Sequence, residues 1–420
     1  MTAGRDTWTL TKVYSKARQV AHNQRTVSLS PKGRPQGNVL VSYIHEPFLR
    51  KDNRVPTSHS NFWESLQIVR TYLELGYAVD VMSYRNRFFR PRKRYEVFVD
   101  ARWNLERLAG QLNDDCIRVM HIDTSHMTFQ NAAESARLLD LQRRRGVTLR
   151  PRRLEYPNLG IEYADCGVVI GNEATMSTFA YAGKPLHPVP VTSAVTFGPP
   201  DGKDFVRART NFVWFGSGGM VHKGLDLVLE FFAGAPDLHL TVCGPVERET
   251  DFAKAYHREL YETDNITTLG WVDVDGSAFR GVLERSVGIV YPSASEGQSG
   301  AVVLCLHAGL IPICSRETGL DITEDMGIQL PDCSPGTLAA AVRSVTQRPS
   351  HELSRMARQA WARARQEHSR EAFALRYRQI VEDLLSGDRQ SKLVRPLGSP
   401  VRSSDDQWPS THASQRPEAS

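Results

Sequence analysis

The sequence has few of the features that would place it at once in a class of proteins. Its 420 residues include only six cysteines, and no two of them form a C-x-x-C pair. This pattern argues against a disulfide framework or a zinc site and favours buried, reduced thiols. The most apolar window, 300–314, is shorter than the ~20 residues of a membrane-spanning helix and contains His307 and Pro312. We therefore expect no transmembrane segment.

The chain also lacks a large charge excess in its body. The formal net charge is +5, but residues 1–37 alone hold seven Lys or Arg against one acid. Without that segment the chain is close to neutral, which argues against nucleic-acid binding. The basic start contains no apolar stretch of the length of a secretory signal. The sequence therefore predicts a cytoplasmic protein that does not bind nucleic acid.

Short apolar runs alternate with helical patterns from Asn38 onward, and this alternation predicts an α/β protein with parallel, doubly wound sheets. We expect two Rossmann-like domains that face a central cleft, at 38–190 and 211–385, with a Pro-rich linker at 191–210. Residues 1–37 and 386–420 are predicted to be disordered. Strands are expected at 39–44, 78–83, 95–99, 117–122, 167–171, 211–215, 238–243, 266–269, 287–291 and 310–315, and a closing helix pair at about 350–385.

Ligands of doubly wound sheets bind at the carboxyl ends of the strands, and three loops there carry suggestive residues. The first, 216–219, is Gly-Ser-Gly-Gly and precedes Lys223 at a helix start. Glycines let backbone amides approach an anion, and a lysine adds a point charge that suits phosphate. It is not a Walker A loop, and a glycine-rich turn also forms for steric reasons alone.

The second loop, 292–300, precedes an apolar helix whose first N–H groups suit a diphosphate. Glu296 lies in this loop and would repel phosphate, so it suits the hydroxyl groups of a sugar better. A purely structural interpretation makes Ser295 and Ser299 helix caps. The third loop, 267–272, ends a strand and offers backbone and apolar groups to a nucleobase.

Together these loops resemble the retaining GT-B glycosyltransferases of group 1 (family 4). The matching segments are 215–216 with 223–226, 243–245, 265–270, 292–297, 308–312 and 317–319. The resemblance implies transfer of a sugar from a nucleotide-sugar donor, such as a UDP- or GDP-sugar, to a glycan or lipid-linked acceptor, as in polysaccharide biosynthesis. It implies no further cofactor and no metal.

The resemblance also assigns roles. Glu296 would orient the donor sugar, and Lys223 would stabilise the leaving diphosphate. The remaining donor-binding residues would be Gly216, Ser217, Gly218, Gly244, Thr268, Leu269, Gly270, Trp271, Gly297, Gln298, Ser299 and Gly300.

Two departures from the family pattern leave alternatives open. The family has a second glutamate that holds the nucleotide ribose, and Leu304 stands near that position here. The family has an arginine before the lysine, and Ser217 follows Gly216 here, in a loop one residue longer. His222 or the loop amides are candidates to replace it. A catalytically silent sugar-nucleotide or glycan-binding protein, or a sugar-nucleotide epimerase, remains an alternative.

The first domain offers fewer signals. By the same edge rule, Asp123 and His126 are candidate catalytic residues on the acceptor side, and His59 is a weaker candidate. Asp273 and Asp275 form a D-x-D pattern, but a helix follows, so helix capping is favoured over metal binding. Six basic residues within 85–94 suit either a peripheral contact with the inner face of a membrane or a solvated loop.

Overall fold

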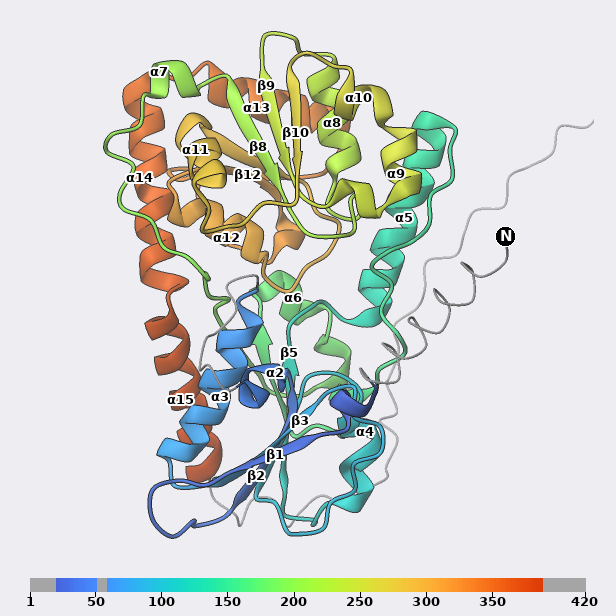
Figure 1. Cartoon of the computed structure of the whole chain (residues 1–420), viewed down its shortest axis with the longest axis vertical. Coiled ribbons are helices and arrows are strands. Elements are labelled where there is room, and N and C mark those ends of the chain that lie inside the picture. Colours follow the sequence, from blue (N-terminus) through green and yellow to red (C-terminus); the bar gives the residue numbers. More distant parts are fainter. Residues whose placement is uncertain (1–19, 51–58, 388–420) are drawn as a thin grey trace, which may run out of the picture. The chain divides into compact units, whose positions relative to one another are not determined.

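The computed structural model of the chain describes residues 20–50 and 59–387, which form an α/β protein with two sheets (Figure 1). One compact unit extends to Ile380, and a second begins at Val381. Both sheets, and the site described below, belong to the first unit.

Seven strands form the N-terminal sheet, in the order β1-β3-β2-β4-β5-β6-β7, and six form the C-terminal sheet, in the order β10-β9-β8-β11-β12-β13. All neighbouring strands are parallel except β1, which runs antiparallel to β3. The strands are β1 (Thr26–Leu29), β2 (Asn38–Tyr43), β3 (Ala78–Ser83), β4 (Val97–Asp100), β5 (Ile117–Ile122), β6 (Cys166–Ile170), β7 (Leu186–Val189), β8 (Asn211–Phe215), β9 (His239–Cys243), β10 (Ile266–Gly270), β11 (Gly288–Tyr291), β12 (Ile311–Ser315) and β13 (Ile328–Leu330).

Helices connect most of the strands. They are α2 (Glu46–Leu49), α3 (Asn61–Glu74), α4 (Asn104–Leu108), α5 (Met127–Arg145), α6 (Glu173–Ser177), α7 (Phe205–Ala208), α8 (Leu225–Ala233), α9 (Thr250–Ala255), α10 (His257–Tyr261), α11 (Ser277–Arg285), α12 (Gly300–His307), α13 (Pro335–Thr346), α14 (Ser350–Glu367) and α15 (Arg370–Ser386). Figure 1 shows α8 and α10 on one side of the C-terminal sheet and α11 and α12 on the other.

The central strands are apolar because both of their faces are covered. In β2, which lies between β3 and β4, all residues after Asn38 are buried. In β8, Phe212, Val213 and Trp214 have no exposed surface. A parallel sheet covered on both faces is encoded by such continuous apolar runs rather than by alternation. The same runs made these strands predictable from the sequence.

The strand orders also determine where a ligand site can form. In the C-terminal sheet the chain runs outward in one direction from β8 through β9 to β10 and in the other from β11 through β12 to β13. The loops that follow β8 and β11 therefore diverge at the carboxyl edge and leave a crevice between them. The glycine loop with Lys223 follows β8, and the loop with Glu296 follows β11.

The predicted α/β class with two doubly wound sheets is confirmed, and the ten predicted strands all occur within about two residues of their expected bounds. The predicted closing helix pair corresponds to α14 and α15.

Three strands escaped prediction. β1 lies within 1–37, so the prediction of disorder there is wrong for residues 20–37, while residues 1–19 lie outside the described residues. β7 contains Pro188, and proline argues against a strand in a sequence, but β7 is an edge strand, where proline is tolerated. β13 has only three residues. The predicted tail, 386–420, is described only to residue 387.

Among the helices of the described residues, none combines the length and the apolar character that crossing a bilayer requires.

Candidate active site

A cavity of about 540 Å³ lies at the carboxyl ends of both sheets, and its size is typical of a small-ligand site. Residues that follow β4 and β5 line it from the N-terminal half of the chain, defined here as the described residues up to 190. Residues that follow β8, β9, β10 and β11 line it from the C-terminal half, defined as residues from 211 onward. The charged lining residues are Arg102, Asp123, Arg153, Lys223, Asp273 and Glu296.

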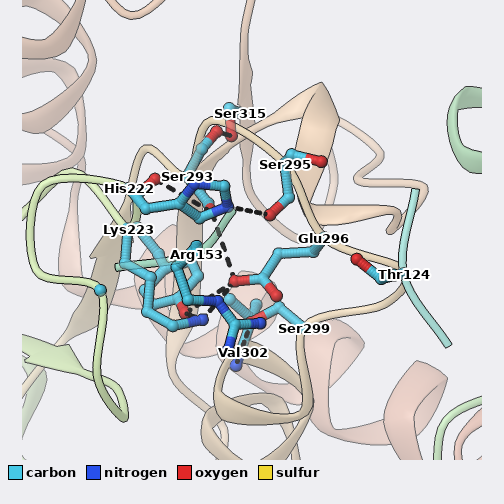
Figure 2. Close-up of polar contacts among 12 residues, drawn as sticks. Thr124, Arg153, His222, Lys223, Ser293, Ser295, Glu296, Ser299, Val302 and Ser315 are labelled. Carbon is cyan, nitrogen blue, oxygen red and sulfur yellow. Dashed lines mark hydrogen bonds and ion pairs between the residues drawn. The ribbon is translucent and has the colours of Figure 1, made fainter. Parts of the chain in front are cut away.

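Lys223 and Glu296 form an ion pair inside this cavity. The Nζ of Lys223 lies 2.5 Å from Oε1 of Glu296, and both side chains are largely buried. Lys223 also donates to the Tyr291 hydroxyl at 2.9 Å. The hydroxyls of Tyr291 and Ser293 donate to the same Glu296 oxygen, at 3.1 and 3.3 Å. Figure 2 shows Glu296 pointing toward Lys223 at the centre of this network.

The charges around Glu296 keep it ionised. Burial by itself would raise the pKa of this carboxyl, but the positive charges of Lys223 and Arg153 outweigh burial and lower its pKa to about 2. Near neutral pH the cavity therefore presents a carboxylate with one oxygen engaged by Lys223. Such a group accepts hydrogen bonds from hydroxyl donors and repels phosphate.

His222 lies beside this pair and is held by the loop of Glu296. Its Nε2 lies 2.7 Å from the Ser295 carbonyl oxygen, and burial lowers its pKa to about 4. The ring is therefore neutral near pH 7, with Nε2 donating to that carbonyl. A neutral imidazole in this position adds no positive charge for phosphate.

The glycine loop after β8 is less open to an anion than the sequence suggested. The Glu249 carboxylate accepts hydrogen bonds from the amides of Gly219 and Met220, at 2.5 and 3.2 Å. These two amides are therefore engaged by a buried side chain of the protein itself. Of the loop glycines, Gly216 lines the cavity together with Ser217, and Gly218 is not among its lining residues.

The first turn of α12 lines the cavity from the C-terminal half. The Ser299 hydroxyl accepts from the Val302 amide at 3.5 Å and so caps this helix, as the structural interpretation expected. Ser295 does not cap it, because its hydroxyl donates to the Gln130 side chain at 3.2 Å. Ser299, Gly300 and Leu304 all line the cavity.

The loop of Glu296 is anchored by the N-terminal half of the chain. The Ser125 hydroxyl donates to the Glu296 carbonyl oxygen and the Thr175 hydroxyl to the Gly297 carbonyl oxygen, both at 2.7 Å. Gly297 packs so closely that a Cβ there would lie 2.6 Å from the Asp123 carbonyl oxygen and 2.7 Å from that of Ile170. Gly297 therefore serves close packing and does not line the cavity.

Not all of the predicted donor-binding residues reach the cavity. Gly244, Trp271 and Gln298 line it. Thr268 points elsewhere, since its hydroxyl donates to the Leu260 carbonyl, and Leu269 is 43% exposed at the surface. The carbonyl of Gly270 accepts from the Gly244 amide. β10 is an edge strand, so its alternating side chains face solvent and α10 rather than the crevice.

On the acceptor side, Asp123 and His126 lie in different places. Asp123 lines the cavity and pairs with Arg102 at 2.6 Å, and Tyr43 donates to it at 3.4 Å. His126 is the N-terminal cap of α5, where Nδ1 accepts from the Thr128 amide at 3.4 Å and Nε2 lies 3.2 Å from the Tyr181 hydroxyl. It is not among the cavity-lining residues, whereas His59 is.

Sequence reasoning missed three residues of the site. Arg102 and Arg153 line the cavity from the N-terminal half, and Glu64 lies behind it and binds the backbone of Thr192. No motif surrounds these residues. The position of Arg102 directly after β4, at the point where the N-terminal strand order reverses between β2 and β4, was the one available signal.

The expected capping role of the D-x-D pattern is wrong, because the N-cap of α11 is Gly276 and no side chain caps that helix. The D-x-D pattern and the basic segment have local partners instead. The Asp273 carboxylate accepts from the Asp275 amide at 3.2 Å, and Asp275 pairs with Arg280. Within the described residues there is no group of three or more His, Cys, Asp or Glu side chains able to hold a metal ion. In segment 85–94, Lys93 pairs with Asp80 at 3.0 Å and Arg94 pairs with Asp115.

The comparisons with known proteins bear on the fold. The chain matches no protein-family model, and no curated protein matches it. Solved structures do match: sucrose-phosphate synthase from Thermosynechococcus elongatus (TM-score 0.58, 15% identity, 85% of this chain and 100% of that one), a glycosyltransferase from Rickettsia africae (0.56, 9%, 84% and 100%), and HepE from Anabaena in complex with UDP and glucose (0.50, 13%, 84% and 100%). The chain therefore has the GT-B glycosyltransferase fold.

Proposed function

We propose that the protein is a retaining glycosyltransferase that moves a sugar from a nucleotide-sugar donor to a glycan or lipid-linked acceptor. The observation that carries this proposal is the buried pair of Lys223 and Glu296, in a cavity lined by the carboxyl ends of both sheets. The solved structures that share the fold include glycosyltransferases, and one of them contains UDP and glucose.

The two members of the pair would act on different parts of the donor. The Glu296 carboxylate accepts hydrogen bonds, so it would hold hydroxyl groups of the transferred sugar. Lys223 would stabilise the negative charge that grows on the diphosphate as its bond to the anomeric carbon breaks. The first turn of α12 would contribute in the same way, because its N–H groups favour an anion.

The acceptor hydroxyl would attack the anomeric carbon from the side that the diphosphate leaves, so that the anomeric configuration is retained. Its proton would pass to the leaving phosphate, and a strong protein base is then unnecessary. Asp123 and His59 line the acceptor side of the cavity and would orient the acceptor. Exclusion of water by the surrounding residues would limit hydrolysis of the donor. We further propose that the reaction needs no metal and takes place in the cytoplasm.

Incubation of the full chain with UDP-, GDP- and ADP-sugars tests this proposal. Donor hydrolysis or transfer should be detectable with one of them, should survive EDTA, and should be lost in Glu296→Gln. The exposed Glu371→Gln is the matched control and should keep the wild-type rate. Absence of nucleotide binding in wild type would remove the donor-site proposal.

A second candidate function rests on Leu304 and Ser217, which stand where the resembling family has a glutamate and an arginine. These residues favour a catalytically silent sugar-nucleotide or glycan-binding protein. Binding of a nucleotide-sugar without transfer or hydrolysis would support it. A changed sugar formed without added acceptor would instead indicate an epimerase.

A further inference from the structure

Arg153 reaches the cavity from the N-terminal half of the chain, on the segment that follows α5. Its backbone is fixed to that helix from both sides. The Arg153 amide donates to both carboxylate oxygens of Glu134, at 2.9 and 2.8 Å. Its carbonyl oxygen accepts from the Gln130 side chain at 2.8 Å. The start of the side chain is therefore held in place independently of the C-terminal half.

The side chain crosses to the glycine loop after β8. A Cβ at Gly219 would lie 2.6 Å from Cγ of Arg153 and 2.9 Å from its Cδ. Gly219 has a φ of +93°, so two features of this position exclude a larger residue. The loop glycine thus leaves the space through which the arginine passes. Figure 2 shows the Arg153 guanidinium beside Lys223 and Glu296.

Among the cations that line the cavity in the described residues, Arg153 differs from the other two. Arg102 pairs with Asp123, and Lys223 pairs with Glu296. Arg153 forms no ion pair within 4.0 Å to an acid of the described residues, and its buried Nε has no hydrogen-bond partner there. Its charge is therefore available to a ligand in the cavity.

Arg153 and Lys223 are close enough to affect each other. Burial lowers the pKa of Lys223, and the positive charge of Arg153 lowers it further, although Glu296 opposes both. Two cations held this close repel each other, and a dianion placed between them would relieve the repulsion. The competing amides of Gly219 and Met220 are already occupied by Glu249.

We propose that Arg153, together with Lys223, binds the diphosphate group of the nucleotide-sugar donor. The guanidinium that the family resemblance would place directly after Gly216, where this chain has Ser217, is then supplied from the other half of the chain. A guanidinium suits this task because its planar donors match two phosphate oxygens at once. The inference rests on the proposed function, since it requires a donor that carries a diphosphate.

The test compares Arg153→Gln with Arg152→Gln in the full chain. Arg152 is the adjacent residue and pairs with Asp251 at 2.5 Å, and it is not among the cavity-lining residues. Calorimetric titration with UDP, GDP and ADP should show affinity lowered roughly ten- to a hundred-fold in Arg153→Gln, the usual value of a lost charged hydrogen bond. Arg152→Gln should bind like wild type.

Nucleosides provide the second readout. Uridine, guanosine and adenosine carry no phosphate, so Arg153→Gln should bind the matching nucleoside as wild type does. Arg153→Lys keeps the positive charge but loses the planar N–H donors of the guanidinium. Its diphosphate affinity should lie between those of wild type and Arg153→Gln. Gly219→Ala, which blocks the path of the arginine stem, should weaken diphosphate binding and spare the nucleoside.

Three results would overturn the inference. One is unchanged diphosphate affinity in a folded Arg153→Gln, and another is an equal loss in Arg152→Gln. The third is an equal loss for the nucleoside, which would indicate a general structural defect. If wild type binds none of the three diphosphates, the proposed function fails as well, so the two failures are told apart by the behaviour of wild type.

Discussion

The carboxylate of Glu296 lies 2.5 Å from the ammonium nitrogen of Lys223, with 11% and 6% of the two side chains exposed. Two charges so far removed from water depend chiefly on each other to offset the cost of burying them. Taking one of them away leaves the other buried without compensation, which is far more costly than losing a pair at the surface.

We therefore predict that Lys223→Met and Glu296→Gln each lower the free energy of unfolding by about 3–5 kcal/mol. The double variant should lose clearly less than the sum, because neither member of the pair is then left buried without the other. Urea unfolding of the four proteins measures this coupling.

The pair of Arg343 and Asp237 is the matched control, because 38% and 61% of its side chains are exposed. The same cycle there should give a coupling below about 1 kcal/mol. Equal coupling energies in the two cycles would show that the Lys223–Glu296 pair is not buried in solution.

Ionisation of Glu64 should make the free energy of unfolding depend on pH with the opposite sign to the ionisation of Glu296. Burial raises its pKa from 4.5 to about 7, although the amide and hydroxyl of Thr192 donate to Oε1 at 2.9 and 3.1 Å. A raised carboxyl pKa means that the folded state holds a proton that the unfolded state releases. Stability should therefore fall as the pH rises from about 4.5 to about 7.

Glu64→Gln removes this titration and keeps an acceptor oxygen for Thr192. We therefore compare the unfolding free energy of the variant with that of wild type at each pH. This difference should shift by about 2–3 kcal/mol in favour of the variant between pH 5 and pH 8, at 1.36 kcal/mol per unit of pKa. Urea unfolding at the two values checks it. A constant difference between variant and wild type would contradict the raised pKa.

We predict that a side chain at position 297 would disturb the site by steric overlap. In Gly297→Ala the new methyl group would meet the carbonyl oxygens of Asp123 and Ile170 at 2.6 and 2.7 Å, both of which belong to the N-terminal half of the chain. We expect a loss of about 1–3 kcal/mol, as for overpacking, together with a lower transfer rate. Thermal unfolding and donor turnover would be measured on the same samples.

Gly336→Ala serves as the control, because no atom lies within 4 Å of the position of its Cβ and it lies inside α13. It should be neutral or slightly stabilising. Equal behaviour of the two alanine variants would mean that the halves do not touch at Gly297.

Because residue 304 is a leucine, we predict that the site recognises the ribose of a nucleotide only weakly. It lines the cavity with an apolar side chain, and the resembling family has a glutamate there that binds ribose hydroxyls. UDP and 2′-deoxy-UDP should therefore bind within about threefold of each other, since the charged hydrogen bond worth about 1.5–3 kcal/mol is missing. Titration with both ligands measures the ratio. A preference above tenfold for UDP would show that another group holds the 2′-hydroxyl.

The sequence predicted the parts of this structure that depend on local pattern. Continuous apolar runs identified strands such as β5 and β8, and the rule that ligands bind at the carboxyl edge brought Lys223 and Glu296 together from loops 73 residues apart. Both loops follow strands of one sheet, so topology alone was sufficient.

The contacts between the N-terminal and C-terminal halves could not be predicted from local pattern or strand topology. Arg153 lies in a segment without periodicity, and only the packing of α5 against the C-terminal half brings it to the cavity. Ion pairs from Arg144 to Asp226 and from Arg145 to Glu259 make that packing visible in the structure. The occupation of the glycine loop by Glu249 is likewise a tertiary contact that no spacing rule contains.

The hydroxyls of Ser125 and Thr175 hold the backbone of Glu296 and Gly297 from the other half of the chain. As a result, the two halves of this protein are not interchangeable parts. A chimera that joins the C-terminal half to the N-terminal half of a structural relative would keep both sheets. It would nevertheless misplace its own glutamate unless the grafted half carried hydroxyls at the positions of Ser125 and Thr175. Anyone who recombines such proteins to change their acceptor must therefore transplant these two anchors along with the acceptor side.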